Sequence, residues 1–121
     1  MRLKQLDHVA LHVRDLEESR RFYGEVLKLQ PLPRPAFDFP GAWFRLGASQ
    51  ELHLIVGRNR EVISSPRGNH YALQVDDLAV WERHLRDVET PFQGPVTRPD
   101  GARQIFLSDP DGHVIELCQA S

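Results

Sequence analysis

The chain has 121 residues, of which 40% are hydrophobic and 26% charged, and its formal net charge is −2. These values fit one globular domain that can bury its own core, and the charge offers no basic field for nucleic acid or an anionic membrane surface. The single cysteine, Cys118, excludes an intramolecular disulfide, and no apolar run suits a signal peptide or a membrane span. We therefore expect a cytoplasmic protein that binds neither nucleic acid nor membrane.

The first predicted element is a strand within DHVALHVRDL (residues 7–16), where apolar residues alternate with others. The apolar residues share one face: Val9, Leu11 and Val13. The residues between them form the opposite face: His8, Ala10 and His12. We expect the apolar face to pack on a helix, which leaves the histidine face for another purpose.

A helix is predicted next, with Asp15 as its N-cap and Glu18 completing a capping box. Its apolar residues recur at imperfect helical spacing: Leu16, Phe22, Tyr23, Val26 and Leu27. Residues 30–40 contain four prolines, so this stretch is predicted to be a loop or an edge strand.

Two further strands are predicted at 41–46 and 51–56. In the second, Leu52 and Leu54 point to one face, so His53 points to the other. Residues 57–69 form the predicted connector to the second half of the chain.

The second half repeats the first. NHYALQVDDL (69–78) matches residues 7–16 at a constant offset of 62, with six identities in ten positions. Asp77 is the predicted N-cap of a helix, whose apolar residues recur at helical spacing: Leu78, Trp81, Leu85 and Val88. Strands at 101–107 and 113–118 follow, joined by an Asp-Pro-Asp-Gly turn.

The predicted organisation is α+β, with one domain over residues 1–121 built from two strand–helix–strand–strand–strand modules. The modules span about residues 5–57 and 68–119. In the last strands, Leu52-His53-Leu54 aligns with Ile115-Glu116-Leu117, so His53 and Glu116 are predicted to be equivalent positions away from the core.

Duplication thus predicts four related polar positions on strands: His8, His53, His70 and Glu116. Three imidazoles and a carboxylate suit a divalent transition metal such as Zn, Ni, Fe, Mn or Co. His8, His70 and Glu116 alone would form a two-histidine, one-carboxylate set with open positions. The alternative is that such histidines are structural, as most single strand histidines are, and Glu51 is a rival fourth ligand.

Alternation also predicts which side chains line a cavity beside these ligands. These are Trp43, Arg45, Gln104 and Phe106. Arg45 beside Trp43 suits a substrate carboxylate or phosphate, although it is equally compatible with a surface position. His12 faces the same side as His8, either as a proton donor or as a polar wall residue.

Three segments of the chain carry a family resemblance: LDHVALHVRDLEESRRFYGEVLKL, NHYALQVDDL and FLSDPDGHVIELCQ. Together they resemble the vicinal oxygen chelate superfamily, which includes glyoxalases, bleomycin-resistance proteins, fosfomycin thiol transferases and extradiol dioxygenases. The resemblance implies paired βαβββ modules that form a cupped mixed sheet around a divalent metal. It implies that the ligands are His8, His53, His70 and Glu116, and that the protein is a homodimer.

The resemblance also implies a small-molecule substrate that chelates the metal through vicinal oxygens, with the metal as Lewis acid. We expect a glyoxalase-like lyase or isomerase in which Glu116, or nearby His12, accepts the substrate proton. The alternatives are a non-catalytic antibiotic-binding protein, an Fe(II) extradiol dioxygenase and a fosfomycin-type thiol transferase.

Several residues depart from the patterns of particular subfamilies. Glyoxalase I usually has glutamate at the position of His53, arginine at that of His12 and asparagine at that of Gly57. Fosfomycin transferases carry threonine and tyrosine where this chain has Ala10 and Phe106. These departures argue against the glutathione-dependent and fosfomycin reactions, while the presence of every ligand argues against the metal-free binders.

Overall fold

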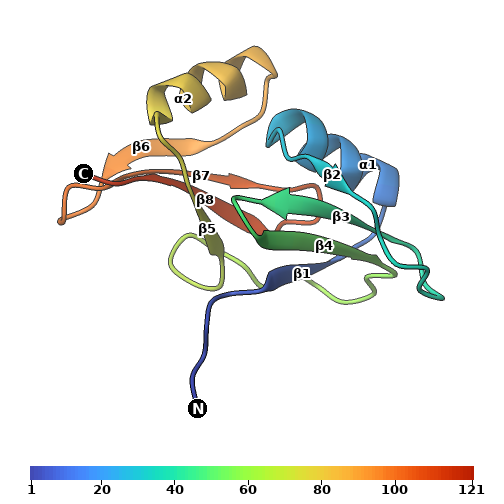
Figure 1. The fold of residues 1–121 in the computed structure, drawn as a ribbon. Helices are drawn as coiled ribbons and strands as arrows, with labels where there is room; N and C mark the ends of the chain where they lie inside the picture. Colours follow the sequence, from blue (N-terminus) through green and yellow to red (C-terminus); the bar gives the residue numbers. More distant parts are fainter. The chain divides into compact units, whose positions relative to one another are not determined.

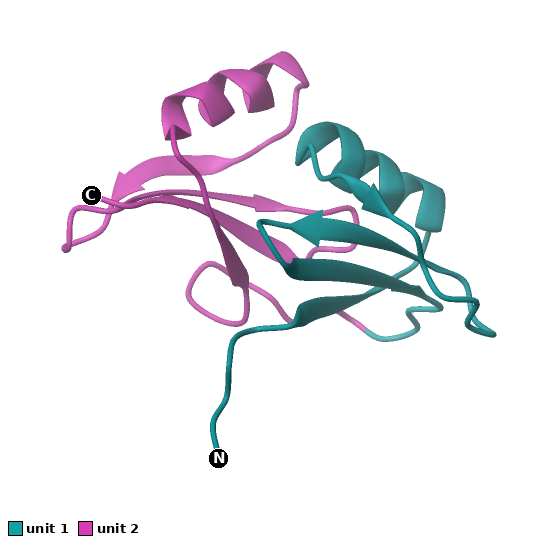
Figure 2. Cartoon of the chain, in the orientation of Figure 1, with its two compact units in different colours: residues 1–60 teal, residues 61–121 magenta.

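A computed structural model describes the whole chain, residues 1–121. The chain divides into two compact units, residues 1–60 and residues 61–121 (Figure 2). Each unit contains one four-stranded mixed sheet and follows the order βαβββ, which confirms the predicted α+β class and the two modules. The boundary between the units lies within the predicted connector, residues 57–69.

The first unit has its strands in the order β1-β4-β3-β2 (Figure 1). β4 pairs in parallel with β1 and antiparallel with β3. The elements of this unit are β1 (His8–Val13), α1 (Leu16–Arg21), the π-helical turn η1 (Phe22–Val26), β2 (Pro31–Leu32), β3 (Gly41–Leu46) and β4 (Gln50–Val56).

Local chemistry explains the start of the helix and the short strand of this unit. Asp15 caps α1, because its side chain accepts a hydrogen bond of 3.0 Å from the backbone N–H of Glu18. The helix continues as the wider turn η1, which accounts for the imperfect spacing of its apolar residues. The prolines leave only two residues in β2, at the edge of the sheet, as predicted for 30–40.

The second unit has its strands in the corresponding order, β5-β8-β7-β6 (Figure 1). Asp77 caps its helix, with its carboxylate accepting from the backbone N–H groups of Ala79 and Val80. The elements are β5 (Tyr71–Gln74), α2 (Leu78–Asp87), β6 (Gln93–Thr97), β7 (Arg103–Ser108) and β8 (Val114–Gln119).

The strand register makes the two sheets equivalent around the candidate ligands. Ala10 lies opposite His53 in the first sheet, and Ala72 lies opposite Glu116 in the second. On the other side, Trp43 lies opposite His53 and Phe106 lies opposite Glu116. The predicted equivalence of His53 and Glu116 is therefore confirmed.

The core of each unit lies between the helix and one face of its sheet. Leu52 and Leu54 of β4 are buried in the first unit, as are Ile115 and Leu117 of β8 in the second. Because side chains alternate along a strand, this burial turns His53 and Glu116 toward the opposite face.

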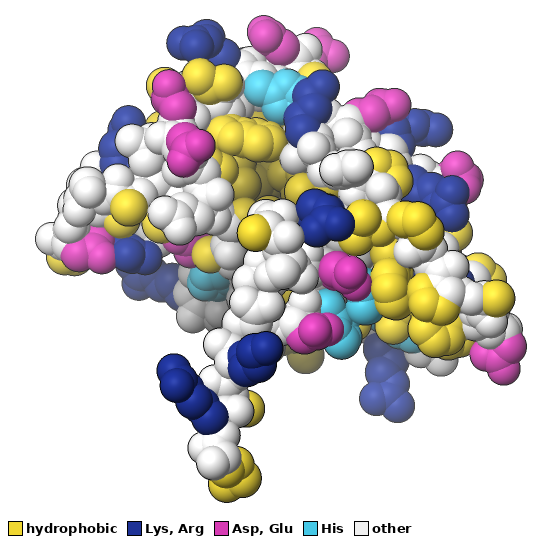
Figure 3. Space-filling view, viewed as in Figure 1, with side chains coloured by type: hydrophobic (Ala, Val, Ile, Leu, Met, Phe, Trp, Pro, Cys, Tyr) yellow, Lys and Arg dark blue, Asp and Glu magenta, His cyan; other side chains and the backbone are white.

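The surface carries both signs of charge. Lys and Arg side chains are interspersed with Asp and Glu on the face drawn in Figure 3. Neither helix has the length and apolar character needed to cross a bilayer.

Candidate functional site

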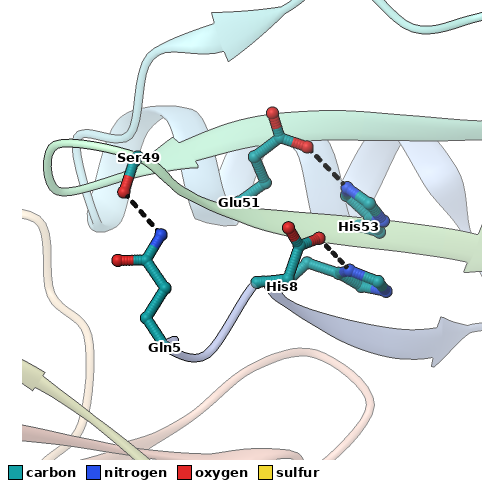
Figure 4. Close-up of polar contacts among 6 residues, drawn as sticks. Gln5, His8, Ser49, Glu51 and His53 are labelled. Carbon is teal, nitrogen blue, oxygen red and sulfur yellow. Dashed lines mark hydrogen bonds and ion pairs between the residues drawn. The ribbon is translucent and has the colours of Figure 1, made fainter. Parts of the chain in front are cut away.

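The candidate ligands of the first unit lie in a stack of three rings. His8 begins β1 and His53 lies in the middle of β4, and their ring centroids are 4.2 Å apart at an interplanar angle of 19°. The indole of Trp43 covers the ring of His53 at 4.0 Å and 4°. We call His8, His53 and Trp43 the histidine stack; Figure 4 shows the two imidazoles one above the other.

Each histidine of the stack has one ring nitrogen against a carboxylate (Figure 4). His8 Nδ1 lies 2.8 Å from Asp7 Oδ2, and His53 Nε2 lies 2.9 Å from Glu51 Oε1. A carboxylate accepts hydrogen bonds, so the facing nitrogen carries the proton. In the neutral rings the lone pairs are then on His8 Nε2 and His53 Nδ1, an arrangement typical of histidines that bind metals.

The segment before β1 is anchored to the same sheet. The backbone N–H of Glu51 donates to the carbonyl of Asp7 at 3.2 Å, and Gln5 Nε2 donates to Ser49 Oγ at 3.0 Å (Figure 4). These bonds fix Asp7 beside His8. Glu51, the rival ligand predicted from sequence, is the partner of His53 in this structure.

The candidate ligands of the second unit face each other directly. His70 Nε2 lies 3.1 Å from Glu116 Oε1, while His70 Nδ1 lies 3.1 Å from the carbonyl oxygen of Gly68. Gln104 Nε2 donates to the other oxygen of Glu116 at 2.9 Å. The side chain of Glu116 is only 5% exposed, so this carboxylate is held in a largely dry environment.

His70 faces one acceptor at each ring nitrogen, the Gly68 carbonyl at Nδ1 and the buried Glu116 carboxylate at Nε2. A neutral imidazole has a single N–H and donates to only one of them, whereas an imidazolium donates to both. A metal cation at Nε2 would take the place of the second proton, with the proton of His70 on Nδ1. The pair can therefore hold either an additional proton or a metal cation.

The spacing of this pair is that of a hydrogen bond and also lies within the range for two ligands of one metal ion. Bonds of about 2.0–2.2 Å to nitrogen and oxygen place two ligands about 3.0 Å apart at a right angle and about 3.4 Å apart in a tetrahedron. The observed separation of His70 Nε2 and Glu116 Oε1 is 3.1 Å. Each unit thus supplies a pair, His8 with His53 and His70 with Glu116, and neither unit by itself gathers three metal-binding side chains.

Three of the four predicted wall residues contact a candidate ligand, and the fourth, Arg45, does not. Trp43 and Phe106 contact the candidate ligands, Trp43 by stacking on His53 and Phe106 by an edge contact with His70 at 5.8 Å. Gln104 holds Glu116. Arg45 is exposed at the end of β3, where its Nη1 donates to the Ala48 carbonyl at 3.1 Å.

Two other titratable groups lie near the candidate ligands. His12 shares the face of His8 but is four residues further along β1, a separation of about 13 Å between their Cα atoms. His12 lies opposite Ile55, two residue pairs beyond His53. Burial, followed by the charge of Glu116, raises the pKa of the Cys118 thiol, so this side chain stays protonated at neutral pH.

Sequence reasoning missed the groups that support the ligands. Asp7 is adjacent to His8 in the sequence, so a contact between their side chains could have been predicted. The carbonyl of Gly68 gave no signal, because backbone contacts of loop residues depend on conformation.

Comparison with known proteins identifies the family of the chain. The Glyoxalase/Bleomycin resistance protein/Dioxygenase superfamily matches residues 5–117 of the chain. The chain belongs to this superfamily. It is similar to Glyoxylase I 4 of Arabidopsis thaliana, with 31% identity over 98% of this chain and 72% of the plant protein.

Two further relatives show how varied the superfamily is. Metallothiol transferase FosB of Bacillus licheniformis is 29% identical over 93% of this chain and 73% of its own length. The crystal structure of a glyoxalase family protein from Bacillus anthracis superposes with a TM-score of 0.85, with 29% identity and complete coverage of both chains.

Proposed function

We propose that the chain is a metal-dependent enzyme of the glyoxalase type, a lyase or isomerase for a small substrate with vicinal oxygens. The proposed metal ligands are His8, His53, His70 and Glu116, and the proposed assembly is a homodimer. The observation that carries the proposal is the pairing of His70 Nε2 with Glu116 Oε1 at 3.1 Å in a largely buried position. Relatives that are named as a glyoxalase and a metallothiol transferase support it.

The donor set determines which metals suit the site. Imidazole nitrogen and carboxylate oxygen bind Zn, Ni, Fe, Mn or Co, and alkaline-earth ions prefer sites made of oxygen alone. When bound, such a metal would act as a Lewis acid that polarises the substrate oxygens.

We assign the proton transfer to Glu116. Its carboxylate accepts a proton from the substrate carbon next to a carbonyl and returns it to the neighbouring carbon, which moves hydrogen between the two carbons without net oxidation. The hydrogen bond from Gln104 fixes one carboxylate oxygen and leaves the other turned toward His70. His12 is the second candidate for this role, at a greater distance along β1 from His8.

The wall residues orient the substrate. Trp43 and Phe106 present aromatic surface beside the candidate ligands and would exclude water there when a substrate is bound. Exclusion of water strengthens every electrostatic interaction with the developing negative charge. Arg45, exposed near the end of β3, would attract an anionic group of the substrate.

The proposal is tested by a turnover screen with each metal. Protein loaded with Zn, Ni, Mn, Fe or Co is offered α-ketoaldehydes, with and without thiols, and product formation is followed by NMR. We expect turnover that a chelator abolishes and metal restores. Glu116→Gln should lower the rate by about 100-fold or more, because it removes the proton acceptor.

Glu17→Gln is the matched control. This carboxylate is exposed on α1 with 77% of its side chain accessible, so its replacement should leave turnover unchanged. Equal activity of Glu116→Gln and the wild-type protein would remove Glu116 from the mechanism. Tight binding of a bulky ligand without turnover, insensitive to chelator, would favour the antibiotic-binding alternative.

A thiol transferase is the second candidate function, because the chain is similar to metallothiol transferase FosB along most of its length. It predicts that metal-loaded protein joins a thiol to an epoxide such as fosfomycin. Ala10 and Phe106, in place of the threonine and tyrosine that those enzymes carry, favour the glyoxalase-type reaction.

A further inference from the structure

A cluster of aromatic rings around one arginine lies in the loop between β2 and β3. The guanidinium carbon of Arg34 is 4.8 Å from the ring centroid of Phe37 and 4.9 Å from that of Phe39. The two rings stack on each other at 5.2 Å and 26°. We call Arg34, Phe37 and Phe39 the aromatic clamp.

The clamp is held in place by backbone contacts. Arg34 Nη2 donates to the carbonyl of Phe39 at 2.8 Å. A side chain at Gly41 would collide with the carbonyl oxygen of Leu54 and would come within 3.1 Å of the Arg34 guanidinium. Glycine at this position therefore lets the arginine lie against β3, and the clamp is organised before any ligand arrives.

The clamp leaves much of its aromatic surface accessible. Phe37 is 46% exposed and Phe39 is 40% exposed, although each ring would gain free energy from burial. A cavity of about 70 Å³ lies beside the rings, and its wall includes Trp43 and His53 as well as the clamp. Clustered exposed aromatic rings beside a cavity are typical of a binding surface and unusual for a purely structural cluster.

The cavity is continuous with the histidine stack. Trp43 stacks on His53 with its ring centroid at 4.0 Å, and lies 6.1 Å from Phe37. His53 is both a wall of the cavity and a proposed ligand. A substrate whose oxygens are held near His53 would therefore extend its substituent along Trp43 toward Phe37 and Phe39.

We propose that the aromatic clamp and Trp43 form a subsite for an aryl or similarly flat apolar substituent of the substrate. The inference rests on the proposed function, because it assumes that the oxygens of the same molecule bind beside His53. A flat ring would contact the accessible parts of Phe37 and Phe39, while the small cavity disfavours bulky branched groups. The substrate class is then an aromatic compound with vicinal oxygens.

A matched pair of chelators tests the subsite. Acetohydroxamate and benzohydroxamate present the same two oxygens to a metal, and only the second carries a ring. Their dissociation constants for the metal-loaded protein are measured by calorimetry. We expect benzohydroxamate to bind about three- to tenfold more tightly, the range that one aromatic contact provides.

Variants of the clamp separate stacking from other effects. Phe37→Ala and Phe39→Ala should bring the ratio of the two dissociation constants close to one, with acetohydroxamate binding unchanged. Phe37→Leu should retain part of the preference, because it keeps apolar volume and loses the ring. Phe92→Ala is the control, since Phe92 lies in the second unit against Arg86 and should leave the ratio unchanged.

A second measurement needs no metal. In a Trp81→Phe background, Trp43 is the only tryptophan and its fluorescence reports on the cavity. Benzohydroxamate should change this fluorescence saturably in metal-free protein, and Phe37→Ala should abolish the change.

Equal binding of the two chelators, or a preference that survives Phe37→Ala, would overturn the subsite and leave the proposed function intact. Saturable binding to metal-free protein, with no metal bound under any condition, would support the subsite and contradict the metal-dependent function.

Discussion

Glu116 is the residue around which the second unit is arranged. Its two oxygens face different donors, Gln104 on one side and His70 on the other. Its burial makes the full negative charge costly unless a cation or several hydrogen bonds compensate it. Gln104 therefore acts as a positioning residue that keeps one oxygen of Glu116 directed at His70.

Replacing Gln104 should weaken metal binding. In Gln104→Leu the side chain keeps a similar size but loses the N–H donor, so the carboxylate can rotate away from His70. Such supporting groups contribute about 10- to 100-fold in metal affinity. Calorimetric titration with Zn or Ni should show this loss, whereas Gln93→Leu, on the exposed edge strand β6, should bind as the wild-type protein does. Identical affinities for Gln104→Leu and wild type would show that Gln104 has no positioning role.

At the residue scale, the sequence was sufficient to place His53 and Glu116 on the same face of equivalent strands, whereas His70 lies immediately before β5 and not within it as predicted. Period-two alternation put His53 opposite Leu52 and Leu54, and the internal repeat related it to Glu116. The sequence could not reveal that His53 stacks on Trp43 or that Gly68 orients His70, because rotamers and loop conformation decide those contacts. The sequence placed Gln104 on the same side of the sheet as Glu116, but it did not indicate the hydrogen bond between the two side chains.

The two helices begin at aspartates in equivalent positions of the repeat. Asp77 accepts hydrogen bonds from the N–H groups of Ala79 and Val80 at 3.0 and 3.4 Å, and Asp15 accepts one from Glu18. Each bond satisfies a helix N–H that lacks a partner within the helix. These caps fix where each helix begins after the ligand-bearing strand.

Removing the second cap should destabilise the chain without affecting the ligands. Asp77→Ala should lower the free energy of unfolding by about 1 kcal/mol, as measured by urea denaturation at neutral pH. Asp77→Asn, which keeps the accepting oxygen, should lose less. Asp87→Ala, at the other end of α2, serves as the control. Unchanged stability of Asp77→Ala would show that the hydrogen bonds at this cap contribute nothing.

At the element scale, the sequence predicted the order of helices and strands but not every boundary. The helix after β1 changes to a π-helical turn at Phe22, which period counting for an α-helix does not anticipate. β6 contains Gly94 and Pro95, and its register shifts between Gln93 and Val96, so its residues lack the alternation of a regular strand. Regular, half-buried elements were predictable, whereas edge strands and irregular turns depend on tertiary context.

At the scale of the whole molecule, the duplication explains why each unit carries only part of the proposed site. Each unit offers two candidate ligands on the side of its sheet away from the helix. A catalytic zinc site usually has three protein ligands and one open position. We therefore expect ligands from both units to be necessary for one metal ion. Both units have a histidine at the beginning of the first strand, His8 in β1 and His70 immediately before β5, and they differ at the last strand, His53 against Glu116.

Metal stoichiometry in purified protein and in single-ligand variants tests this account most directly. After loading and dialysis, elemental analysis should find one metal ion for each chain. His8→Ala from the first unit and Glu116→Ala from the second should each remove it, while His84→Ala, on α2, should leave it bound. Two ions per chain, each lost with the ligands of one unit only, or no metal at saturating concentration, would contradict a site that both halves of the duplication build.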